Sequence, residues 1–190
     1  LINGIDINEL AIDDWYKNLG ILFQDYNFYS HLSVKENIHL GKPMAPIDGK
    51  GIIEAAKKAD AHNFIMEYKD KYDQIMSEKI EGGIRPSSGQ AQKIAIARFF
   101  YRNAPLAIFD EPTAAIDAIS EYKIFNTIYN FFENKTVVII SHRFSTVRNA
   151  DRIIVLDKGK IVEEGTHEQL LTKRNGIYRK SYKLQAEGYK

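Results

Sequence analysis

The sequence has 190 residues, a formal net charge of +1 and no cysteine. The length suits about one domain, the balanced charge argues against an electrostatic nucleic-acid binder, and the missing thiols exclude disulfides, thiolate catalysis and cysteine-ligated zinc. No apolar run reaches the ~18 residues that a membrane span needs, and no signal peptide is visible. Because the chain begins at Leu1 and its first methionine is Met44, we expect it to be a piece of a longer polypeptide.

The first 25 residues are expected to hold a tight turn and one buried strand. Asn3-Gly4 is a typical hairpin turn, and residues 8–17 form a weakly helical connector. The apolar run 19–23 predicts a buried strand, which Gln24 follows.

Residues 26–86 are expected to form a small helical insertion. Residues 26–40 look irregular, and residues 41–51 look like a linker because they are rich in glycine and proline. Helical periodicity begins at Ile52, and a second helix is predicted over 64–72.

Residues 87–190 return to alternating helices and strands. Ser87, with Gln90 three residues later, is a capping-box pattern that starts a long apolar helix. Two buried strands are predicted, at 106–110 and 136–140, and a strand pair surrounds Lys158-Gly159. Helices begin near residues 118, 166 and 176, and the first of them has a predicted buried face of Tyr122, Phe125, Tyr129 and Phe132.

Polar side chains follow three of the predicted strands at the point where each strand ends. They are Gln24, the pair Asp110-Glu111, and His142. Carboxyl ends of parallel strands meet at one edge of a sheet, where ligands of open α/β sheets bind. A single acidic turn or a single histidine at a strand end usually lies on the surface without a function. Three such strand ends together favour a site that binds metal and water, in which Asp110 points toward the metal and Glu111 toward the water.

Taken in order, these segments resemble the nucleotide-binding domain of the ATP-binding cassette (ABC) family. The tail from Ala150 to His167 is similar to exporter-type members. The matching motifs are the Q-loop (Phe23-Gln24-Asp25), the signature (Ser87-Ser88-Gly89-Gln90), Walker B (Leu106 to Glu111), the D-loop (Ala114-Ala115-Ile116-Asp117) and the switch histidine (Ile140-Ser141-His142-Arg143).

The resemblance implies an α/β fold with a P-loop NTPase-like (RecA-like) core, a mostly parallel sheet and an inserted α-helical subdomain. Residues 1–190 would form a single ABC ATPase domain. Its core would comprise residues 1–25 and 87–190, and its helical subdomain residues 26–86. The chain would belong to an exporter that hydrolyses ATP at the cytoplasmic face of the cell membrane, fused to a transmembrane domain upstream, with no nucleic-acid partner.

The resemblance also implies ATP and Mg²⁺ as cofactors and assigns roles to particular residues. Asp110 would hold the metal, and Gln24 would contact both the metal and the attacking water. Glu111 would act as base toward that water, and His142 would contact the γ-phosphate. In a head-to-tail dimer with a second ABC domain, the partner's nucleotide would be served by Ser87, Ser88, Gly89, Gln90 and Asp117.

Two departures from the family pattern stand out. The P-loop motif G-x-x-x-x-G-K-[ST] is absent from the 190 residues, so we expect the chain to start just after it and to be inactive alone. Ser88 stands where the family usually has glycine. If this position needs a left-handed backbone, the strain would be about 1–3 kcal/mol.

Two other functions remain open from the sequence. One is an impaired ABC module that supplies only the signature surface to an intact partner. The absent P-loop and Ser88 favour it, whereas Glu111 and His142 argue against it. The other is a soluble ABC protein of DNA repair or translation, which the exporter-like tail and the neutral charge disfavour.

Overall fold

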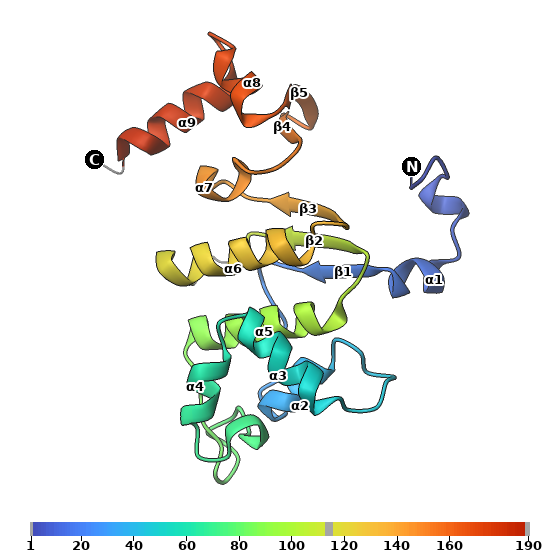
Figure 1. The fold of residues 1–190 in the computed structure, drawn as a ribbon, viewed down its shortest axis with the longest axis vertical. Helices are drawn as coiled ribbons and strands as arrows, with labels where there is room; N and C mark the ends of the chain where they lie inside the picture. Colours follow the sequence, from blue (N-terminus) through green and yellow to red (C-terminus); the bar gives the residue numbers. More distant parts are fainter. Residues whose placement is uncertain (1, 113–115, 189–190) are drawn as a thin grey trace. The chain divides into compact units, whose positions relative to one another are not determined.

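The computed structural model describes residues 2–112 and 116–188. The chain divides into two compact units, Leu1–Ile140 and Ser141–Lys190. Figure 1 shows the elements of each unit coloured along the sequence.

A three-stranded parallel sheet forms the centre of the first unit. Its strands are β1 (Leu19–Leu22), β2 (Leu106–Asp110) and β3 (Thr136–Ile140), in the order β1-β2-β3. This arrangement confirms the α/β fold with a parallel sheet. The register places Leu22 opposite Phe109, and Asp110 opposite Ile140, so the three carboxyl ends lie at one edge.

Helix α5 (Ser88–Arg102) is the central helix of this unit and contacts β1, α2 and α3. It starts where the capping box predicts and ends at Arg102, and the next residue, Asn103, caps it with a left-handed φ of 53°. Phe99 packs against Phe109 of β2 with ring centroids 4.3 Å apart, and Phe100 packs edge-on against Phe131 of α6 at 5.3 Å. Aromatic packing therefore fixes α5 to the sheet and to α6.

The helical region comprises α2 (Val34–His39), α3 (Gly49–Lys58), α4 (His62–Glu67) and the 3-10 turn η2 (Lys71–Asp73). The expectation that residues 26–40 are irregular is wrong for α2, because Ser33 and Glu36 form a capping box there. Helix α3 begins before Ile52, since the Asp48 side chain accepts the Gly51 N–H at 3.0 Å. The second predicted helix is shorter than expected and is followed by η2.

The N-terminal residues contain the predicted tight turn. Ile2 and Ile5 form an antiparallel bridge across Asn3 and Gly4, whose φ values of 50° and 83° suit a hairpin turn. A 3-10 turn η1 (Ile7–Glu9) and helix α1 (Ile12–Lys17) lead into β1.

Helix α6 (Ala118–Phe131) buries a different stripe from the one predicted. Ile124 and Ile128 are fully buried, with Phe125 and Phe132 beside them, whereas Tyr122 is 65% exposed. Tyr122 lies about 200° around the helix from Ile124, at 100° per residue, so it points away from this stripe. The prediction of a buried Tyr122 is therefore wrong.

The second unit comprises α7 (Phe144–Val147), β4 (Ile153–Asp157), β5 (Lys160–Gly165), α8 (His167–Thr172) and α9 (Ile177–Gly188). Strands β4 and β5 are antiparallel and turn at Lys158-Gly159, as predicted. The small core consists of Ile153, Leu170 and Tyr178. No helix in the described part of the chain has the length and apolar character to cross a membrane.

Candidate functional site

Two predicted site segments meet at the carboxyl edge of the sheet. Asp110 is the last residue of β2 and Glu111 follows it, while Gln24 lies two residues beyond the end of β1. Because β1 and β2 are parallel and Leu22 pairs with Phe109, the chain leaves both strands on the same side. The two carboxylates and the Gln24 amide thus emerge from neighbouring strand ends.

Glu111 has an unusual backbone conformation. Its φ is 44°, and its N–H donates to the carbonyl of Ile140 at 3.0 Å. A left-handed non-glycine residue costs roughly 1–2 kcal/mol, and such residues cluster at functional sites. The bond to Ile140 holds Glu111 against the end of β3.

His142 follows β3 by two residues and belongs to the second unit. Within that unit, the Gln185 side chain in α9 donates to the carbonyl of His142 at 3.2 Å and accepts the Phe144 N–H at 2.9 Å. Gln185 therefore holds the loop that carries His142. Nothing in the local sequence marks this glutamine, because it lies more than 40 residues from its partners.

The signature segment forms the first turn of α5. The hydroxyl of Ser87 accepts the Gln90 N–H at 3.2 Å, and the Gln90 side-chain oxygen accepts the Ser87 N–H at 2.9 Å. Ser88 is the first residue of the helix and is not among the described residues with positive φ. The condition for left-handed strain at Ser88 is therefore not met.

Asp117 caps the amino end of α6. Its carboxylate accepts the N–H groups of Ser120 at 2.9 Å and Ile119 at 3.1 Å, and the hydrogen bonds from Ser120 lower the pKa of Asp117. Ala114 and Ala115, which precede it in the predicted D-loop, lie outside the described residues.

A polar cluster joins α5 to α6 and to the end of α3. The Lys93 ammonium donates to Asp60 and to the hydroxyl of Ser120, both at 2.8 Å, and that hydroxyl donates to Asp60 at 3.1 Å. Burial alone would raise the pKa of Asp60, but the bonds from Lys93 and Ser120 outweigh burial and lower it. These residues lie 27 to 60 positions apart, so no local pattern in the sequence predicts the cluster.

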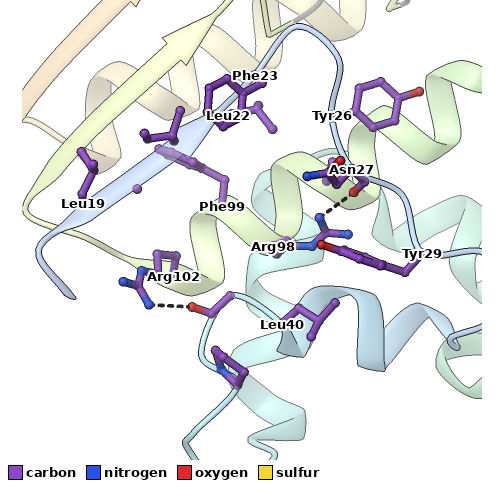
Figure 2. Close-up of a pocket in the computed structure, with 15 residues that line it drawn as sticks. Leu19, Leu22, Phe23, Tyr26, Asn27, Tyr29, Leu40, Arg98, Phe99 and Arg102 are labelled. Carbon is purple, nitrogen blue, oxygen red and sulfur yellow. Dashed lines mark hydrogen bonds between the residues drawn. The ribbon is translucent and has the colours of Figure 1, made fainter. Parts of the chain in front are cut away.

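A pocket of about 320 Å³ lies between β1, the loop after it, residues 40–43 and α5 (Figure 2). Arg98 donates to the carbonyls of Asn27 and Asn37, each at 2.7 Å, and Arg102 donates to that of Gly41 at 3.3 Å. Burial lowers the pKa of Arg98. Two arginines one turn apart on α5 thus bind the chain that surrounds the pocket.

The edge of the sheet suits a magnesium ion that is bound together with phosphate groups. No three histidine, aspartate or glutamate side chains within 2–112 and 116–188 form a ready metal cluster. Mg²⁺ usually takes only one or two protein carboxylates and completes its shell with phosphates and water. Half-buried Asp110, at the end of β2, fits that requirement.

Comparisons with known proteins identify the family of the chain. The ABC transporter family model matches residues 1–114. The chain is 44% identical to "Toxin RTX-I translocation ATP-binding protein" of Actinobacillus pleuropneumoniae over 98% of its length and 26% of that protein. It is equally identical to "Leukotoxin export ATP-binding protein LtxB" of Aggregatibacter actinomycetemcomitans, over 97% of its length and 25% of that protein.

A solved structure of an ABC exporter has a similar fold. The fold matches "Structure of a bacterial Atm1-family ABC exporter with ATP bound" with a TM-score of 0.88 and 33% identity, over 97% of this chain and 31% of that one. The chain spans about a quarter of the length of the two curated relatives. The family model and the fold together show that this chain belongs to the ABC transporter family.

Proposed function

We propose that residues 1–190 form part of the ATPase module of an ABC exporter, which hydrolyses ATP at the cytoplasmic face of a membrane and is joined to a transmembrane domain. The observation that carries this proposal is the position of Asp110, Glu111 and Gln24 at one edge of a parallel sheet. The relatives named for toxin translocation and leukotoxin export support transport out of the cell as its direction.

Phosphoryl transfer to water depends mainly on positioning and on neutralisation of charge. Bound Mg²⁺ would supply that neutralisation of phosphate charge. Asp110 and Gln24 would hold the ion, directly or through water, and Glu111 would take the proton of the attacking water. His142 donates a hydrogen bond to the γ-phosphate.

The second half of each site comes from another ABC domain in a head-to-tail dimer. Ser87, Ser88, Gly89 and Gln90 face the partner's nucleotide, and Asp117 lies between the two sites. The amino end of α5 offers backbone N–H groups and a positive dipole to a phosphate. Its 15-residue length supports this role.

The test is ATP hydrolysis by the complete polypeptide that contains these residues. Glu111→Gln should lower turnover by about 10²–10⁴-fold, the usual contribution of a positioned general base, and leave ATP binding intact. Glu133→Gln, which changes an exposed carboxylate of the same unit, is the matched control and should not alter turnover. Equal turnover in both variants would contradict the role of Glu111, and no hydrolysis by the unchanged protein would favour the impaired module.

A further inference from the structure

The loop that follows Gln24 is bound to α5 at two points. The Tyr26 hydroxyl donates to the carbonyl of Ser88 at 2.8 Å, and Arg98 donates to the carbonyl of Asn27 at 2.7 Å. The first bond reaches the amino end of α5 and the second its third turn. In Figure 2, Tyr26 and Asn27 lie on the loop and Arg98 lies on the helix, and a dashed line marks the bond from Arg98 to Asn27.

A buried network binds the same loop at Tyr29. Asn37 of α2 is fully buried, donates to the carbonyl of Tyr29 at 2.9 Å and accepts the Tyr29 N–H at 3.2 Å. Arg98 donates to the side chain of Asn37 at 3.1 Å and lies 5.0 Å from the centre of the Tyr29 ring. The loop and α5 are therefore connected by contacts that a displacement of either would disturb.

Tyr26 is the point where the Gln24 loop touches the signature segment. It lies two residues after Gln24, and its bond partner Ser88 lies inside Ser87-Ser88-Gly89-Gln90. Burial raises the pKa of Tyr26 above its ordinary value of 10.0, so the hydroxyl keeps its proton at neutral pH and remains a donor. Tyr26 is absent from the set of residues that the sequence predicts for the site.

We propose that Tyr26 is a positioning residue that couples the two ATP sites of the dimer. This inference rests on the proposed function, in which Gln24 serves the nucleotide of its own chain and the signature segment serves the nucleotide of the partner. A shift of the Gln24 loop on nucleotide binding moves the Tyr26 hydroxyl, and with it the Ser88 carbonyl. The amino end of α5 then turns toward or away from the partner's nucleotide.

The variant Tyr26→Phe in the complete polypeptide tests the coupling because it removes a single oxygen atom. The Hill coefficient for ATP should fall toward 1 and kcat should fall about three- to tenfold, the factor that one neutral hydrogen bond supplies, while KM changes less than about twofold. Tyr68→Phe is the matched control. It removes a buried hydroxyl that has no hydrogen-bond partner in the described part of the chain, so both values should stay unchanged.

Hydrogen exchange gives a second readout that does not depend on turnover. Amides of residues 87–92 should exchange faster in Tyr26→Phe than in Tyr68→Phe. Equal exchange in the two variants, or an unchanged Hill coefficient in Tyr26→Phe, would overturn the coupling even if kcat falls. A residue that acts only within one site could lower kcat without changing cooperativity. If the unchanged protein hydrolyses ATP through Glu111, either result leaves the proposed function standing, whereas absence of hydrolysis would overturn both.

Discussion

Glu111 and Ser88 are two residues whose backbone conformation bears directly on their proposed roles. Glu111 has a φ of 44°, although it has a Cβ, and a hydrogen bond to Ile140 maintains that conformation. We interpret the left-handed backbone as the means by which β2 ends abruptly and directs two adjacent carboxylates to different partners. Ser88, by contrast, has an ordinary helical conformation at the start of α5.

The conformation of Ser88 gives a direct prediction for Ser88→Gly. Glycine relieves no strain there and adds freedom to the unfolded chain, so the free energy of unfolding should fall by no more than about 1 kcal/mol. Urea denaturation of residues 1–190, followed by circular dichroism, measures it. A stabilised variant would mean that Ser88 is strained after all.

Helix α5 connects most of the functional segments of the first unit. Its amino end is the signature segment, Lys93 joins it to Asp60 and Ser120, and Arg98 and Arg102 bind the chain around the pocket. Asp60 has a φ of 54° after the last turn of α3, so a residue that tolerates the left-handed region is needed there.

Asp60→Asn tests the cluster without disturbing the backbone, because asparagine also tolerates a left-handed φ. Since Asp60 is partly exposed, the variant should lower the free energy of unfolding by about 1 kcal/mol at pH 7. The pKa of Asp60 is lower in the folded protein than in the unfolded chain. The difference in the free energy of unfolding between the two proteins should therefore have its full size above the unfolded carboxyl pKa of about 3.9. It should vanish as pH falls through the lower pKa of the folded protein.

Urea denaturation of residues 1–190 between pH 7 and pH 3 measures this difference. Asp14→Asn is the control, because it removes an exposed ion pair to Lys17 that should contribute little at any pH. A difference that does not shrink as pH falls would assign the effect of Asp60→Asn to packing and not to charge.

Local patterns in the sequence predict where several elements begin, but not what joins them. The Ser87–Gln90 and Thr166–Gln169 capping boxes mark the starts of α5 and α8. The same pattern at Ser33 starts α2 within the aromatic segment 26–40, where we expect irregular chain from the sequence. The bonds from Tyr26 to Ser88 and from Lys93 to Asp60 join residues 62 and 33 positions apart, and only the folded chain brings them together.

On the scale of the whole molecule, the proposed function gives one chain two different functional surfaces. The carboxyl edge of the sheet holds Asp110, Glu111 and Gln24, and the amino end of α5 holds the signature segment. In the proposed head-to-tail dimer, each active site combines the first surface of one chain with the second surface of the other. Two chains with different defects can then restore one site between them.

The most direct measurement of this claim is ATPase complementation between Glu111→Gln and Ser87→Arg versions of the complete polypeptide. Each version alone should be inactive. Their equimolar mixture should recover up to about a quarter of the original activity, since half of random dimers are mixed and each mixed dimer keeps one intact site. Coupling between the two sites would lower this fraction without abolishing it. A mixture of Glu111→Gln with the double variant Glu111→Gln, Ser87→Arg is the control and should stay inactive. No recovery in the first mixture, with mixed dimers demonstrably present, would place both residues in a site within one chain and contradict the shared site.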